Sequence, residues 1–310
     1  MDGTGVWTDL LDPTEAEIAE HAPKGLRPEA LAELLRPADR DGNVRPTLQG
    51  HGAYVFGVLL APVAVPAEDR VFYQEIDLVA TRDTLLTVRK TPGREPPFDL
   101  TNVKAVVAAR EQPRPGAIAY HLFDEVAEDY LNLLDDLDDE IDELEAGVDQ
   151  QPSSSTHKRL SELRHDLLHV RRRLAPTRDA ARGVVDGRTD IDANRLLRRE
   201  VFPREVEAQF ARVYEKLLRA TESLEFARDL LAAVRDYHQT RIANDQNDVV
   251  RRLTAIASLL LFPTFIVGVY GQNFRHMPEL DWKLGYGFSW LIIVAGTIVQ
   301  MAFFKKRGWL

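Results

Sequence analysis

Residues 253–270 read LTAIASLLLFPTFIVGVY, and residues 285–304 read GYGFSWLIIVAGTIVQMAFF. Neither stretch contains a charged residue, and each is close to the ~20 residues that a helix needs to cross the hydrocarbon core of a bilayer. Both stand at the C-terminal end of the chain, where no later sequence would bury them as core helices of a soluble protein. The sequence therefore predicts two transmembrane helices, at about 253–271 and 286–304.

Basic residues flank this pair of spans on one side. They are Arg251 and Arg252 before the first span and Lys305, Lys306 and Arg307 after the second, whereas Arg275 and Lys283 in the loop are offset by Glu279 and Asp281. By the positive-inside rule, both termini are predicted to be cytoplasmic in a multi-pass protein of the cell membrane. In an assembly, Lys305, Lys306 and Arg307 would form a cytoplasmic basic ring. Aromatic residues stand where interfacial anchors are expected: Trp282, Tyr286, Trp290 and Trp309.

A long helix is predicted to lead into the first span. From Glu205 to Phe262 there is neither Gly nor Pro, and Pro203 stands where a helix would start. Such a helix would be roughly 90 Å long at about 1.5 Å per residue, so it would extend far out of the membrane as a stalk. We expect residues 119–250 to form a cytoplasmic helical hairpin and stalk, and residues 251–310 to form the membrane part.

Residues 1–118 predict a compact cytoplasmic α/β domain. Three stretches rich in β-branched and aromatic residues, at 53–60, 71–80 and 84–89, are typical of strands. The net charge of −10 argues against a nucleic-acid partner, since binding phosphates needs surplus Lys and Arg. The chain has no cysteine, which excludes disulfides and thiolate sites. No signal peptide is visible at the N-terminus.

Two oppositely charged helical stretches follow this domain. Thirteen Asp or Glu and no Lys or Arg lie between Asp124 and Asp149, and a basic stretch that includes Arg159 and Arg173 follows a predicted turn at 151–156. An antiparallel hairpin with solvated faces and mutual ion pairing is one interpretation. The alternative is an acidic face that concentrates cations near a pore mouth.

One stripe of the first span differs from its other faces. Steps of three and four residues from Asn247 give Val250, Thr254, Ala257, Leu261, Thr264, Gly268 and Gly271. Small and polar residues on one stripe indicate close helix packing or a pore lining, and in a symmetric ring the two interpretations coincide. Two spans cannot enclose a water-filled path alone, so the sequence predicts a homo-oligomer.

Residues 270–274 read YGQNF and residues 277–280 read MPEL, before Trp282, Lys283, Gly285 and Tyr286. With the second span and the terminal KKRGWL, this pattern resembles the CorA family of Mg²⁺/Co²⁺ transporters, in which YGMNF precedes MPEL and an aromatic-rich loop. The resemblance is most specific over 240–310 and extends to the acidic hairpin. It implies a funnel-shaped homopentamer with an α+β cytoplasmic domain, a long helical stalk and two C-terminal transmembrane helices.

The resemblance also implies roles for single residues. Gly271, Gln272 and Asn273 would form the selectivity filter, in which the amide oxygen of Asn273 holds the hydrated ion, and Glu279 would lie in the outer loop. The pore-lining positions would be Asn247, Val250, Leu253, Thr254, Ala257, Leu261, Thr264 and Gly268. Neutral oxygen acceptors suit Mg²⁺, which sheds its water reluctantly. Membrane lipid and divalent cations are the expected partners, and no cofactor is expected.

Two positions depart from the family pattern. Gln272 stands in place of the usual Met, and such changes occur in branches that move other metals, so Zn²⁺ and Ni²⁺ join Mg²⁺ and Co²⁺ as candidate ions. Arg212 falls where the family carries an acidic sensor between subunits, which indicates an altered Mg²⁺ feedback site.

Three other functions compete with Mg²⁺ transport: a zinc transporter of the same fold, a membrane-anchored structural or signalling protein without ion flux, and a zinc hydrolase. His165 and His169 have a spacing that can bind zinc, but Asp166 stands where a metalloprotease needs Glu and a third ligand is not evident. No Gly-rich phosphate-binding loop is present. The sequence therefore favours ion flow down the electrochemical gradient over catalysis or ATP-driven pumping, and it leaves direction and proton coupling open.

Overall fold

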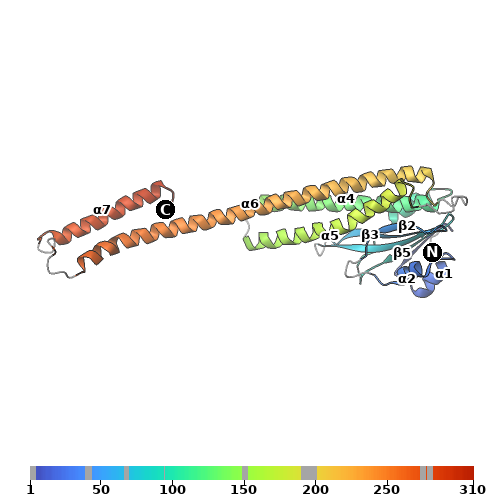
Figure 1. Cartoon of the computed structure of the whole chain (residues 1–310), viewed down its shortest axis with the longest axis horizontal. Coiled ribbons are helices and arrows are strands. Elements are labelled where there is room, and N and C mark those ends of the chain that lie inside the picture. Colours follow the sequence, from blue (N-terminus) through green and yellow to red (C-terminus); the bar gives the residue numbers. More distant parts are fainter. Residues whose placement is uncertain are drawn as a thin grey trace. The chain divides into compact units, whose positions relative to one another are not determined.

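The computed structural model describes residues 5–38, 44–65, 70–93, 95–148, 153–189, 201–272, 277 and 282–310. The chain divides into two compact units, Met1–Val234 and Arg235–Leu310. Figure 1 shows the sheet and its neighbouring helices in the first unit and helix α7 in the second. Helix α6 begins in the first unit and ends in the second.

In the described part of the N-terminal unit, five strands form one sheet in the order β1-β5-β4-β3-β2. The strands are β1 (Trp7–Leu11), β2 (Thr47–Gly50), β3 (Val55–Val65), β4 (Arg70–Ala80) and β5 (Leu85–Lys90). β1 and β5 are parallel, and the other neighbouring pairs are antiparallel. The three strands predicted from composition are confirmed as β3, β4 and β5, and β3 runs on to Val65.

Helices cover both faces of this sheet. On one face, Phe56, Val79 and Val88 pack against Ile18 and Leu34 from the short helices α1 (Glu15–His21) and α2 (Pro28–Leu35). The residues between them in the strands point to the other face, as the two-residue period of a strand requires. They pack in a larger core with α3 (Thr101–Ala108) and the long helices. The expected α+β fold class is therefore confirmed, while the domain boundary at residue 118 stays a prediction.

A cluster of charged side chains is buried where the sheet meets α2. Lys90 Nζ lies 2.9 Å from Glu75 Oε1 and 2.5 Å from Asp77 Oδ2, and it donates a 2.7 Å hydrogen bond to the Glu33 carbonyl. Arg36 lies 2.8 Å from the same Glu75 oxygen. Burial raises the pKa of Asp77 to about 7; Lys90 opposes this shift and Glu75 adds to it.

The raised pKa of Asp77 predicts a pH-dependent stability. The folded state holds the Asp77 proton more tightly than the unfolded chain, whose Asp pKa is about 3.9. This contribution is complete below the unfolded value and is lost as the pH rises to about 7. Asp77→Asn cannot titrate, so its melting temperature should rise relative to the parent's between pH 4 and pH 7, by on the order of 5 °C. A difference that stays constant over this range would contradict the assignment.

Three long helices continue the chain: α4 (Pro115–Gly147), α5 (Ser153–Val185) and α6 (Arg204–Tyr270). The predicted helices are thus confirmed, but the turn placed at 151–156 is too long, because α5 begins at Ser153. Serine is favoured at helix starts as well as in turns, so composition alone did not separate the two. The acidic and basic helices pair through Glu140 and Arg159, and Lys216 of α6 lies 2.8 Å from Asp124.

The C-terminal unit contains the end of α6 and helix α7 (Gly285–Lys306). Both helices are long and apolar enough to cross a membrane, and almost none of their apolar windows is buried within the chain. They approach each other closely, since a Cβ atom on Gly296 would overlap the ring of Phe262. Exposed apolar side chains along two helices are typical of lipid-facing or subunit-facing surfaces.

Candidate functional site

The stripe predicted from the sequence lies on an exposed face of α6. All of its members within the helix are exposed in the single chain: Asn247, Val250, Thr254, Ala257, Leu261, Thr264 and Gly268. Ala255 is buried and Phe262 is half-buried against α7, on a different face of the helix. The structure therefore leaves the stripe uncovered within one chain and available to other copies.

Two threonines give the stripe oxygen acceptors. The hydroxyl groups of Thr254 and Thr264 donate 2.8 Å hydrogen bonds to the carbonyls of Val250 and Leu260, one helical turn earlier. Because each hydroxyl hydrogen is used within the helix, the remaining lone pairs of the oxygen are left to accept. Such acceptors suit the outward-pointing hydrogens of a hydrated cation.

Two leucines lie at this stripe: Leu261 is one of its members, and Leu253 lies beside it. Leu253 is 65 % exposed and Leu261 is 66 % exposed, and they stand about two helical turns apart. A ring of either side chain around an axis would narrow a water-filled path with hydrocarbon.

The described part of α6 ends at the predicted filter. The Gly271 amide donates to the Val267 carbonyl at 3.0 Å, and the Gln272 amide donates to the Val269 carbonyl at 3.4 Å. Gly271 and Gln272 are exposed, while Asn273 and Glu279 lie outside the described residues. The carbonyls of the last helical turn carry the negative end of the helix dipole, which favours a cation there.

Basic residues lie at the two chain positions that flank the apolar stretches, away from the predicted filter. Lys305 and Lys306 are exposed in the last turn of α7, and the guanidinium carbon of Arg307 lies 4.9 Å from the centre of the Phe303 ring. Before the first span, Arg251 lies 3.3 Å from Asp248. The orientation predicted from these charges stays a prediction.

The zinc-site hypothesis gains no support from the geometry. The His165 and His169 rings lie 4.2 Å apart, but the part of the chain that the structure describes holds no group of three or more His, Cys, Asp or Glu side chains able to bind a metal ion. Arg212, which falls at the expected sensor position, is exposed on α6.

Comparisons with known proteins cover nearly the whole chain. A sequence model of the CorA-like Mg²⁺ transporter proteins matches residues 2–306. The cobalt/magnesium transport protein CorA of Thermotoga maritima is 26 % identical over 99 % of this chain and 84 % of its own length. The putative metal ion transporter YfjQ of Bacillus subtilis is 30 % identical over 98 % of this chain and 89 % of its own length.

Solved structures show the same fold. The complete CorA magnesium transporter from Methanocaldococcus jannaschii aligns with a TM-score of 0.77 at 19 % identity, over 100 % of this chain and 93 % of the other. The cytoplasmic domain of ZntB from Vibrio parahaemolyticus aligns over 77 % of this chain and 88 % of its own, with a TM-score of 0.56 at 14 % identity. The family resemblance inferred from residues 270–286 is thus confirmed along the chain, and the protein belongs to the CorA-like Mg²⁺ transporter family.

Proposed function

We propose that this protein conducts hydrated Mg²⁺, with Co²⁺ as a second ion, through a membrane pore lined by α6 from several copies of the chain. The observation that carries the proposal is the exposed stripe of small and hydroxyl side chains on α6, because the other exposed residues of this helix between 253 and 270 are apolar. Membership of the transporter family supports the same activity. The proposed activity is transport rather than catalysis, and the metal ion is cargo rather than cofactor.

The chemistry of the stripe suits a hydrated ion. Mg²⁺ exchanges its water slowly and demands octahedral oxygen coordination, so a lining of neutral acceptors can hold the hydrated ion without dehydrating it. Asn247, Thr254 and Thr264 supply amide and hydroxyl oxygens along the path. At its outer end, Gly271, Gln272 and Asn273 would form the filter, where the negative ends of the α6 dipoles converge.

Assembly is part of the proposal, because one pore helix per chain cannot enclose a path. We propose a homopentamer, in which α6 lines the axis and α7 lies outside it. Ala257 and Gly268 on the stripe allow close approach of neighbouring helices. A native mass measurement in mild detergent should give five copies, and a stable monomer or dimer would contradict this arrangement.

The proposed orientation in the membrane rests on the positions of the charged residues, and the proposed driving force is the membrane potential. We propose that residues 1–118 and 119–250 are cytoplasmic and that residues 251–310 cross the cell membrane, with Lys305, Lys306 and Arg307 ringing the inner side. Glu279 would then lie in the outer loop, where its charge attracts cations. Two positive charges moving inward across 100 mV gain about 4.6 kcal/mol, so uptake needs no ATP.

A zinc transporter of the same fold is the second candidate function. Gln272 in place of the family's Met favours it, because a polar amide at the mouth changes the groups that meet the ion. Uptake of Mg²⁺, Co²⁺, Ni²⁺ and Zn²⁺ by the purified protein in liposomes, compared side by side, tests the two functions. We expect Mg²⁺ and Co²⁺ to exceed Zn²⁺, and Gln272→Met to widen that difference. Zn²⁺ as the fastest ion would favour the alternative.

Leu253 and Leu261 are proposed to form a hydrophobic gate, because rings of apolar side chains stop ions by excluding water. Leu253→Ala or Leu261→Ala should raise Mg²⁺ uptake by liposomes that already contain high Mg²⁺, about tenfold if the barrier falls by about 1.4 kcal/mol. Ile256→Ala, an exposed apolar position outside the stripe, is the matched control and should behave as the parent. If both leucine variants assemble normally yet stay closed, the gate lies elsewhere.

A further inference from the structure

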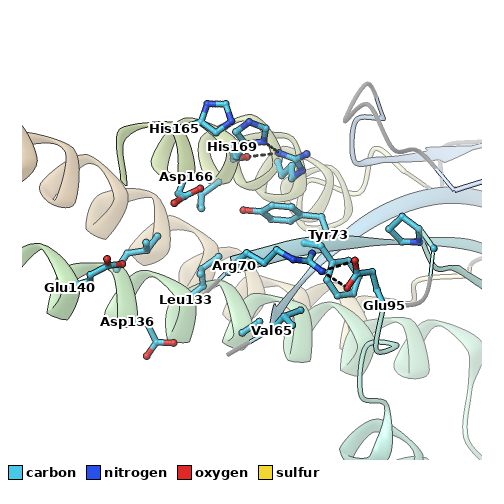
Figure 2. A pocket seen from close by; sticks show the side chains of 18 of the residues that line it. Val65, Arg70, Tyr73, Glu95, Leu133, Asp136, Glu140, His165, Asp166 and His169 are labelled. Carbon is cyan, nitrogen blue, oxygen red and sulfur yellow. Dashed lines mark hydrogen bonds and ion pairs between the residues drawn. The ribbon is translucent and has the colours of Figure 1, made fainter. Parts of the chain in front are cut away.

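The N-terminal unit contains a cavity of about 750 Å³ that the transport proposal does not use. It lies between the paired ends of β3 and β4 and the helices α4 and α5 (Figure 2). Its volume falls within the range of pockets that bind small organic molecules. Part of its wall is apolar, formed by Phe72, Leu133, Leu137 and Val170.

Arg173 of α5 places a positive charge in this wall. Its side chain is 9 % exposed, and its guanidinium carbon lies 4.1 Å from the centre of the Tyr73 ring. Nη1 donates hydrogen bonds to the His169 carbonyl at 2.9 Å and to His169 Nδ1 at 3.1 Å. Among the described residues, Nε has no hydrogen-bond partner. A buried charge without a counterion is costly, so this geometry is suited to an anion.

The other two arginines in the wall are already neutralised. Arg70 Nη2 lies 2.7 Å and 2.9 Å from the two carboxylate oxygens of Glu95, a pair visible in Figure 2, and Arg159 pairs with Glu140. No carboxylate in the described part of the chain forms an ion pair with Arg173. Glu75 lines a small adjoining cavity with Arg173, but it pairs with Arg36 and Lys90. Among the described residues, Arg173 is therefore the one arginine of the wall without a carboxylate partner.

Carboxylates at the rim limit the charge that a ligand can carry. Asp136 of α4 and Asp166 of α5 also line the cavity, and both are exposed. Burial raises the pKa of Tyr73, and Arg173 opposes this shift whereas Asp166 adds to it. The rim would repel a polyanion such as a nucleoside diphosphate, whereas a single negative charge matches Arg173, which has no carboxylate partner in the described part of the chain.

We propose that this cavity binds a small monocarboxylate with an apolar body, whose carboxylate pairs with Arg173. A guanidinium presents parallel N–H donors that match the two oxygens of a carboxylate. The ligand's apolar part would then contact Leu133, Leu137 and Val170 and leave water. This site lies outside the membrane unit and adds a soluble ligand to the proposed transporter.

Calorimetric titration of the full chain in lipid nanodiscs with hexanoate tests this site. Hexanamide has nearly the same shape without the charge, so it should bind the parent at least about tenfold more weakly. Arg173→Gln should weaken hexanoate binding to a similar extent. Arg172→Gln, the same change at an exposed position next in the chain, should leave hexanoate binding unchanged.

Several results would overturn the proposal. One is equal affinity for hexanoate and hexanamide, and another is tighter binding of adenosine diphosphate than of hexanoate. The third is no detectable binding of hexanoate at concentrations up to about 10 mM. The hexanamide comparison uses the parent chain, so it decides the question even if Arg173→Gln fails to fold.

Discussion

Asn273→Ala should lower Mg²⁺ uptake into liposomes at least about tenfold while the assembly stays intact. Each subunit would lose one amide oxygen that accepts a hydrogen bond from the ion's water shell, and each such bond contributes about 0.5–1.5 kcal/mol. The loss is repeated in every copy around the ring, so it exceeds the ~1.4 kcal/mol that corresponds to a factor of ten. Uptake of Mg²⁺ from a fixed outside concentration is the measurement.

Asn244→Ala is the control for this variant. Asn244 is an exposed asparagine of α6 that lies outside the stripe, so the same chemical change there should leave uptake near the parent's rate. Size-exclusion profiles of both variants should match the parent's. Unchanged uptake by Asn273→Ala in a normally assembled protein would show that the amide ring is not the filter.

Phe210→Ala should destabilise the N-terminal unit by about 3–5 kcal/mol, the usual cost of removing a buried aromatic ring. Phe210 of α6 is fully buried and meets three rings edge-on, those of Tyr120, Phe123 and Phe202, at centroid distances of 6.0, 5.2 and 5.4 Å. The cavity left behind would loosen α6 from α4. Thermal unfolding followed by circular dichroism should show a melting temperature about 10 °C lower or more.

Phe226→Ala is the matched control for Phe210. Phe226 lies on the same helix but is 63 % exposed, so its loss should change stability by less than about 0.5 kcal/mol. Equal melting temperatures for the two variants would contradict the packing described for the aromatic cluster.

The sequence predicted the elements whose signal is local. The β-branched and aromatic composition of β3–β5, the charge-free membrane stretches and the long run without Gly or Pro are each contained within one element, so they could be identified directly. β1 and β2 were not predicted, because their stability depends on partners elsewhere. Trp7 of β1, for example, is opposite Leu85 in a parallel pair and donates a hydrogen bond to Thr87.

The candidate pore stripe could be predicted because a helical period places its residues on one face, and its role as a pore lining stays a prediction. The cavity around Arg173 could not. The charge pattern predicts that Arg173 is a solvated or ion-paired residue of a basic helix, but Arg173 is buried against Tyr73, 100 positions earlier in the chain. No local pattern links an arginine on a helix to a tyrosine on a distant strand.

Mg²⁺ uptake by the purified protein in liposomes, at inside-negative potentials set by K⁺ gradients and valinomycin, tests the central claim most directly. Conduction down the electrochemical gradient predicts that the initial rate rises with the potential, without ATP or a proton gradient. Uptake no faster than in protein-free liposomes at every potential would contradict a Mg²⁺ pore and would leave a membrane-anchored protein without ion flux.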